Sequence, residues 1–100
     1  MPAGYREVWE HRPDGRALCA LIHGELGWLM YLREPGDSGF SSRNPDYAGP
    51  EDATIDYYLS NGQRDEYPAA WALPLEVVER ALEHFRETGE QAPFVEWYAD

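Results

Sequence analysis

Residues 71–98 read WALPLEVVERALEHFRETGEQAPFVEWY and predict a helix with both ends marked, followed by a strand. Apolar side chains recur from Leu75 to Phe85 at the three- and four-residue intervals of an amphipathic helix. Pro74 suits the first helical position because its missing N–H would have no intrahelical partner. Gly89 can adopt the left-handed conformation that ends a helix. We therefore expect a helix of about 15 residues, roughly 22 Å long.

The end of the chain has the composition of a strand. Phe94, Val95, Trp97 and Tyr98 are all strand formers. Because side chains alternate along a strand, Phe94, Glu96 and Tyr98 are expected on the face opposite Val95 and Trp97. The chain is therefore predicted to end inside a sheet.

Three strand patterns occupy the first third of the chain. Residues 5–11, 17–23 and 28–33 are rich in strand-forming side chains. The Pro-Asp-Gly sequence at 13–15 supplies a turn between the first two. The simplest arrangement of these three segments is an antiparallel meander.

The middle of the chain combines a long loop with a hairpin. Residues 34–52 are rich in proline, glycine and serine without a sustained period, which predicts an irregular loop. Residues 53–60 alternate like a strand, and Asn61-Gly62 is typical of a two-residue hairpin turn. The returning strand, residues 63–67, is short.

The length and composition indicate one small folded unit. A chain of 100 residues that is 43% hydrophobic can bury a single core, so we expect residues 1–100 to form one domain. The order of its elements predicts an α+β fold. We expect one antiparallel sheet of five to six strands, a long helix packed on one face, and a final strand.

The formal charge of −11 is distributed unevenly along the chain. Residues 1–33 contain equal numbers of arginines and acids, so the whole excess lies in residues 34–100. Such a field disfavours nucleic acid and anionic membranes as partners and favours a basic protein. A second explanation is that the acids simply keep a small domain soluble.

Cysteine and histidine usage gives no sign of a cofactor. Cys19, the single cysteine, lies in the apolar run ALCALI, which predicts an inert buried thiol. His11, His23 and His84 are scattered without partners at metal-ligand spacing, so neither a metal nor another cofactor is expected. Without an apolar run of about 18 residues or a signal-peptide hydrophobic segment, we expect a cytoplasmic protein.

One stretch superficially suggests catalysis. Gly36, Asp37, Ser38 and Gly39 look like the nucleophile loop of trypsin-like serine proteases. The chain is too short for a two-barrel protease, and it lacks a histidine and an aspartate in the contexts of a triad. A glycine-rich turn leading to an exposed Phe40 explains the stretch better. An enzyme is therefore the least favoured class.

Acidic and aromatic residues outside the strands indicate a protein partner. The predicted helix carries a row of glutamates on one flank, although solvated charge is the commoner cause of such a row. For Trp71, a place capping the core at the helix entrance explains the residue better than an interface does. Aromatic and arginine side chains are frequent interface anchors. The predicted partner-binding residues are Asp37, Phe40, Asp46, Tyr47, Arg64, Asp65, Glu66, Tyr67, Glu79 and Glu83.

Several markers occur together in residues 54–98. They are the Asn61-Gly62 hairpin, Pro74 at the helix start, Ala81 and Phe85 on the inner face, the Thr88-Gly89 stop, Pro93, and the closing Val95-Glu96-Trp97. This combination resembles the Imm1 family of bacterial immunity proteins. Residues 1–53 match the family only in general character, as strands followed by a glycine-rich loop.

The resemblance implies a cytoplasmic protein that binds and neutralises a cognate toxin of a polymorphic toxin system. Nucleic-acid deaminases are among the toxins associated with this family, and the family has no catalytic residues to carry over. Toxins that act on nucleic acid generally have basic surfaces, which agrees with the acidic charge of this chain. A small acidic regulatory module with an unrelated partner would have much the same sequence and is the alternative.

Overall fold

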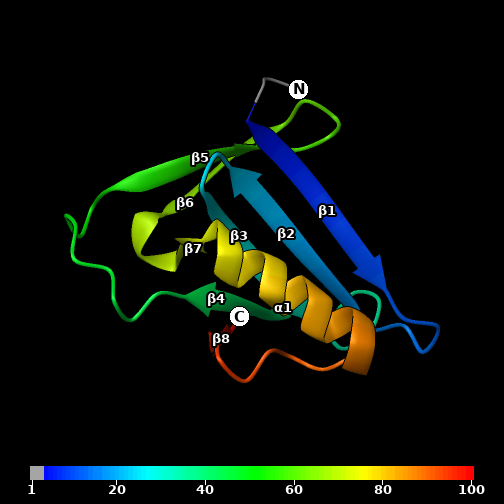
Figure 1. The fold of residues 1–100 in the computed structure, drawn as a ribbon. Coiled ribbons are helices and arrows are strands. Elements are labelled where there is room, and N and C mark those ends of the chain that lie inside the picture. The colour runs from blue at the N-terminus through cyan, green and yellow to red at the C-terminus, as the bar shows by residue number, and fades with distance from the viewer. Residues whose placement is uncertain (1–3) are drawn as a thin grey trace.

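The computed structural model describes residues 4–100, which form a six-stranded sheet, a two-stranded sheet and one α-helix (Figure 1). The elements are, in chain order, β1 (Tyr5–His11), β2 (Ala17–His23), β3 (Leu26–Leu32), β4 (Phe40–Arg43), β5 (Thr54–Tyr58), β6 (Arg64–Pro68), the 3-10 helix η1 (Ala69–Trp71), β7 (Leu73–Pro74), α1 (Leu75–Thr88) and β8 (Glu96–Ala99). The larger sheet has the order β1-β2-β3-β4-β8, with β7 paired to β3. All pairings are antiparallel, which confirms the predicted α+β class and the β1-β2-β3 meander.

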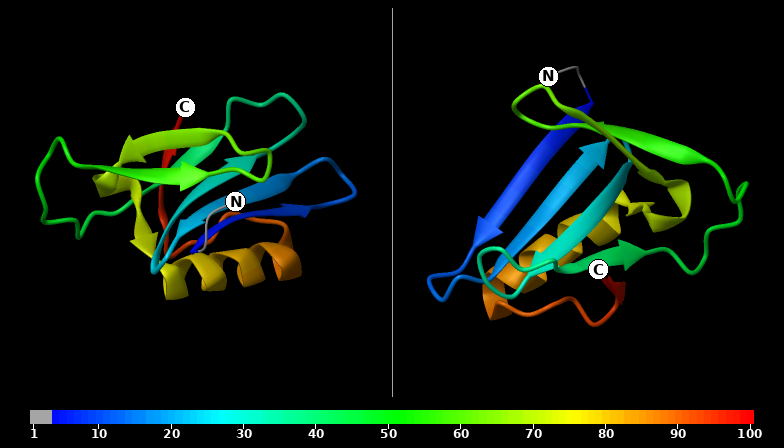
Figure 2. Two further views of the ribbon diagram at one scale, coloured as in Figure 1. Left: turned by 90° about the horizontal axis from the view of Figure 1, so that it is seen from above. Right: turned by 180° about the vertical axis from the view of Figure 1, so that it is seen from behind.

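The helix and the β5–β6 hairpin lie on opposite faces of the larger sheet (Figure 2). On the helix face, Val78 and Phe85 pack with Leu18 and Leu29 in the main core. On the other face lies a second, smaller core, which consists of Cys19, Leu21, Trp28 and Tyr57. The hairpin is therefore a separate layer of its own, an addition to the single sheet expected from the sequence.

The helix α1 begins and ends close to the predicted positions. Its first residue is Leu75, and Pro74 precedes it as the N-cap without a capping side chain. The N–H of Leu75 donates to the carbonyl oxygen of Glu25 at 2.8 Å, so the β2–β3 turn supports the helix start. At the other end, Gly89 has a φ of +74° and its N–H donates to the Phe85 carbonyl at 2.7 Å. The predicted glycine stop is confirmed.

The predicted loop 34–52 contains a strand, so the expectation of a wholly irregular segment is wrong. Strand β4 pairs with β3 and β8 and thereby joins the end of the chain to the sheet. Ser41 and Ser42 of β4 are fully buried. Ser42 Oγ accepts from the Leu29 N–H at 3.1 Å and donates to the Trp71 carbonyl at 3.0 Å. Serine is not a strong strand former, so partners distant in sequence decide this pairing.

The β5–β6 hairpin forms as predicted, but its turn is longer than two residues. The Leu59 N–H donates to the Gln63 carbonyl at 2.9 Å, which leaves Ser60, Asn61 and Gly62 between the paired positions. Gly62 has a φ of +91°, a conformation that glycine adopts without strain. This geometry is the three-residue hairpin in which a glycine forms a bulge.

Candidate functional site

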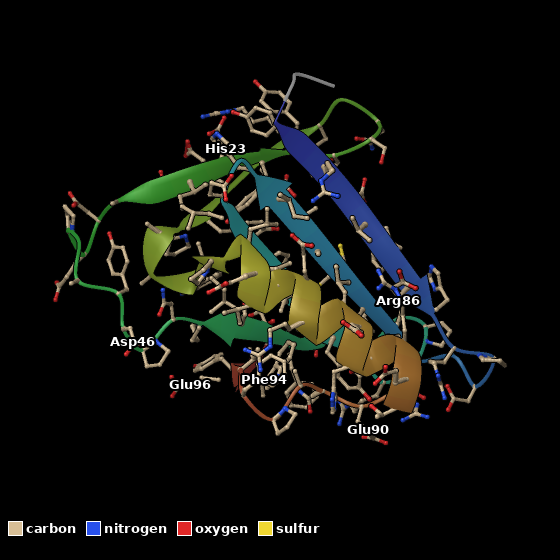
Figure 3. The ribbon with its side chains drawn as sticks, in the orientation of Figure 1. His23, Asp46, Arg86, Glu90, Phe94 and Glu96 are labelled. Carbon is tan, nitrogen blue, oxygen red and sulfur yellow. The ribbon has the colours of Figure 1, made fainter. Side chains whose placement is uncertain are left out.

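A cavity of about 630 Å³ opens beside the first turn of α1. Its walls come from three parts of the chain: the end of β4 with the following loop, β7 with the start of α1, and the connection from α1 to β8. We name this cavity the helix-start groove, and its lining residues are 43–46, 73, 74, 77 and 93–96. In Figure 3, the labelled residues Asp46, Phe94 and Glu96 lie on this side of the molecule.

The helix-start groove combines buried apolar residues with exposed acids. Leu73 and Val95 are buried and Val77 is half-buried, so they form its core side. Asp46 and Glu96 are exposed, and within residues 4–100 neither carboxylate has a hydrogen-bond or ion-pair partner. A groove of this kind suits a ligand with an apolar stem and a cationic head.

Phe94 forms an exposed aromatic wall of the helix-start groove. Its side chain is 42% exposed, which is unusual for so large an apolar group. The guanidinium carbon of Arg80 lies 4.5 Å from the centroid of the Phe94 ring. His84 meets the same ring edge-on, at a centroid distance of 6.3 Å. These two helix residues hold Phe94 in an exposed position, as expected for an interface anchor.

A row of stacked side chains, the Arg43 stack, adjoins the groove at Arg43. The Arg43 guanidinium carbon lies 3.8 Å from the Trp71 ring centroid and 4.6 Å from that of Tyr98. Beyond Trp71 the row continues through Tyr67 to Trp28, with centroid distances of 6.0 and 4.3 Å. Burial lowers the pKa of Arg43, although arginine remains charged at neutral pH. Tyr98, at 59% exposure, is the solvent end of the Arg43 stack.

The opposite end of α1 is fastened by arginines from the β1–β2 region. Arg12 Nη1 donates to the carbonyl oxygen of Arg86 at 2.9 Å, and Arg86 Nε donates to a carboxylate oxygen of Glu10 at 2.8 Å. Arg16 Nη1 donates to Glu90 at 2.8 Å. Figure 3 shows Arg86 and Glu90 toward this end of the helix. Cations here interact favourably with the negative end of the helix dipole.

The comparison with known protein families concerns nearly the whole chain. The family model for immunity protein Imm1 matches residues 5–99. The chain belongs to the Imm1 family. This match confirms the resemblance drawn from residues 54–98, and membership implies a protein that neutralises a toxin. No curated protein matches the chain.

The predicted partner residues of this Imm1 protein are spread over several surfaces. Asp46 lines the helix-start groove. Tyr47, its neighbour, is half-buried and folds back so that its hydroxyl donates to the Pro50 carbonyl at 2.8 Å. Asp37 accepts two bonds from the Arg33 guanidinium at 2.8 and 2.9 Å, and this pairing holds the Asp37 pKa well below its usual range. Of these three residues, only Asp46 has a side chain without a hydrogen-bond or ion-pair partner among residues 4–100.

The predicted residues on β6 mostly make contacts within the hairpin. Arg64 pairs with Asp56 at 3.4 Å and with Glu66 at 2.9 Å. Tyr67 belongs to the Arg43 stack, and its hydroxyl donates to Asp65 at 3.4 Å. Burial, followed by the charge of Asp65, raises the pKa of Tyr67. The charges of this segment are therefore largely satisfied inside the protein.

The remaining predicted residues lie on the helix side of the sheet. Phe40 is half-buried and packs on the main core, so the expectation of an exposed Phe40 is wrong. Glu79 and Glu83 line a shallow cavity of about 220 Å³ beside β1, together with Arg6 and Arg86. The two arginines balance the two glutamates of this cavity, whereas the helix-start groove has Asp46 and Glu96 against Arg43 alone and keeps an excess of negative charge.

Three residues of the groove and the stack were not among the predicted partner residues, although the sequence carried a signal for them. Alternation at the chain end predicted that Phe94, Glu96 and Tyr98 share one face, and all three are exposed, although β8 begins only at Glu96 and Phe94 lies in the preceding turn. An exposed face with two aromatic side chains could have marked an interface. Arg43 had no such signal, because the Arg43 stack brings together side chains from β3, β4, β6, η1 and β8.

The described side chains are not grouped for metal binding. Within residues 4–100, no set of three or more His, Cys, Asp or Glu side chains converges on a possible metal position. Cys19 is 2% exposed, and burial raises the pKa of its thiol to about 12, which confirms the predicted buried thiol. In the same described part of the chain, α1 and η1 are too short or too polar to cross a membrane.

Proposed function

We propose that this Imm1 protein binds a basic, nucleic-acid-targeting toxin, such as a deaminase, in the cytoplasm and occludes its active site. In this proposal the protein acts by stoichiometric binding and performs no catalysis. Family membership supports the toxin partner, and the arrangement of free carboxylates supports its basic character. The carboxylates are the observation on which the proposal rests.

Arginines and acids are used differently in this protein. Arg16, Arg33, Arg64 and Arg86 each form an ion pair with an acid of the same chain. Within residues 4–100, the acids without hydrogen-bond or ion-pair partners lie mainly on the β4–β5 loop, the outer side of α1 and β8. They include Asp46, Glu51, Asp52, Glu76, Glu79, Glu83, Glu87 and Glu96. The net negative charge is thus available to a partner.

A protein that acts on nucleic acid needs cationic side chains to bind phosphates. An acidic partner competes for those side chains and is attracted to the same surface as the substrate. Electrostatic attraction of this kind accelerates association by a factor of about 10 to 1000 at low salt. Charge therefore explains fast capture, while a close apolar contact is needed for slow release.

The direct test is co-expression with a toxin domain encoded by a neighbouring gene, where the cognate toxin of an immunity protein is expected. We expect the cells to survive, and the two proteins to elute from a sizing column as one complex of fixed stoichiometry. An inactive variant of the toxin domain should form the same complex. Continued killing together with separate elution of the two proteins would contradict the proposal.

The basic character of the toxin is tested by association kinetics. We expect the association rate constant to fall at least about tenfold between 20 and 500 mM salt, while the dissociation rate constant changes much less. An association rate that is independent of salt would show that the free carboxylates do not guide the encounter. It would leave toxin binding itself intact.

A further inference from the structure

We propose that the helix-start groove receives an arginine side chain of the toxin, with its guanidinium beside Asp46 and Glu96. This inference rests on the proposed function and specifies how the toxin is recognised. It concerns the cavity of about 630 Å³ next to the first turn of α1.

Charge makes the groove selective for a cation. Asp46 and Glu96 both line it, and within residues 4–100 neither side chain has a partner that would neutralise it. Arg43 also lines the groove, where it stacks on Trp71 and keeps its positive charge, so two carboxylates and one guanidinium leave an excess of negative charge there. An incoming cation would therefore supply the counter-charge that the groove lacks.

The shape of the groove suits a long side chain on a protruding loop. Leu73, Val77 and Val95 offer apolar surface against which the methylene stem of an arginine can pack. The volume of about 630 Å³ lies within the range of about 300–1000 Å³ that is typical of ligand sites. One arginine does not fill such a volume, so neighbouring residues of the toxin loop enter with it.

The aromatic wall favours a guanidinium over an ammonium group. A guanidinium is planar, is less strongly hydrated than an ammonium, and can both stack on a ring and bind carboxylates through several N–H groups. The same chain already shows this behaviour, since Arg80 lies over Phe94 at 4.5 Å and Arg43 over Trp71 at 3.8 Å. A lysine could offer charge to Asp46 and Glu96 but would lack the flat surface.

The experiment measures the dissociation constant of the inactive toxin domain from the neighbouring gene. We compare the wild type with Asp46→Asn and Glu96→Gln, which remove one charge each with little change in shape. Glu25→Gln is the matched control, because Glu25 is an exposed acid of the β2–β3 turn that lies outside the groove and outside the set of acids proposed to attract the toxin. We expect each groove variant to bind about 10- to 100-fold more weakly. The Glu25 control should change binding less than about threefold.

A double-mutant cycle then identifies the cation. Each surface arginine of the toxin is changed to glutamine and to lysine, and each change is combined with Asp46→Asn. We expect one arginine whose loss costs about tenfold or more in the wild type and much less in the Asp46→Asn variant. Its change to lysine should restore only part of the affinity.

Two different failures can be told apart. If the wild type binds the toxin and both groove variants bind as tightly as Glu25→Gln, the groove proposal is wrong while the proposed function stands. The groove proposal is equally overturned if no toxin arginine couples to Asp46. If the wild type neither binds the toxin nor protects cells, the proposed function itself fails. Thermal unfolding of each variant checks that a loss of binding is not a loss of folding.

Discussion

Charged side chains from other parts of the chain border both ends of α1, but they are paired at one end and unpaired at the other. At the C-terminal end, Arg12 and Arg16 reach from the β1–β2 region to the Arg86 carbonyl and to Glu90. At the N-terminal end, Asp46 and Glu96 border the helix-start groove without partners among residues 4–100. One end is closed by internal ion pairs, and the other leaves its charges and its cavity open.

In our proposal, this difference separates the residues that stabilise the fold from those that recognise the toxin. Paired charges at the closed end satisfy the helix carbonyls and hold the helix against the β1–β2 region. Unpaired carboxylates at the open end contribute little to folding and repel one another slightly. Such a cost is tolerable because the main core, with Val78 and Phe85 at 0% and 1% exposure, holds the helix in place independently of these charges.

Gly89→Ala should have the largest effect on stability, because it changes the backbone position around which the arginines of the closed end pack. A Cβ at this position meets Arg12 Nε and Arg16 Nη2 at 2.8 Å each, and the φ of +74° disfavours any side chain. We expect a loss of about 1–3 kcal/mol in the free energy of unfolding, measured with urea. Gly24→Ala is the control, since Gly24 has a φ of +61° and open space around it. Equal losses at both positions would show that the arginines move aside without cost.

Arg12→Ala should have the next largest effect. It removes the bond to the Arg86 carbonyl and a cation at the negative end of the helix dipole, which together stabilise the fold by about 0.3–1 kcal/mol. Hydrogen exchange of the last-turn amides of α1 should accelerate. Arg6→Ala, which removes an exposed arginine of β1, should change stability by less than about 0.5 kcal/mol. Similar effects of both variants would mean that the closed end is not held by Arg12.

The stability of the closed end should depend on pH through the ionisation of Asp14. Hydrogen bonds from Arg16 lower the Asp14 pKa, so the folded carboxyl ionises more easily than the unfolded one. Its stabilising contribution is therefore present above the unfolded value of about 3.9 and is lost as the pH falls through the folded pKa. An NMR titration of the wild type should give the Asp14 carboxyl a midpoint pH below about 3.9. Arg16→Gln should raise that midpoint, and an unchanged midpoint would remove Arg16 as the cause.

Asp46→Asn and Glu96→Gln should have the smallest effect on stability. Because these carboxylates have no partners within the described chain, we expect changes below about 0.5 kcal/mol in the free energy of unfolding. The same variants are expected to weaken toxin binding strongly. A loss above about 1 kcal/mol in either variant would give the open end a structural role and weaken the contrast between the two helix ends.

Local patterns predicted most of the fold. The amphipathic period of α1, its glycine stop and the alternating exposure around β8 all depend on residues close in sequence, and all three are found. Strand β4 was missed because Ser41 and Ser42 carry no apolar signal. Their burial depends on hydroxyl partners and on strands β3 and β8, which lie far away in the chain.

The candidate site was predicted only in part. Asp46 was among the predicted partner residues and lines the helix-start groove. Arg64 and Asp37 had equally good sequence arguments, but the fold supplies each with an ion-pair partner. A sequence shows how many charges a surface has. It does not show which of them are already neutralised, because pairing depends on distances of a few ångströms that the fold sets even for residues as near in sequence as Arg33 and Asp37.

By itself, the sequence determined the helix, its glycine stop, the β1-β2-β3 meander, the acidic charge and the resemblance to the Imm1 family. These features follow from composition and from interactions over a few residues. Only the tertiary structure decided that α1 has a closed end and an open end. The bond between Arg12 and Arg86 spans 74 positions in the chain, and the helix-start groove joins three separate segments. Contacts of that range exist only once the whole sheet has formed.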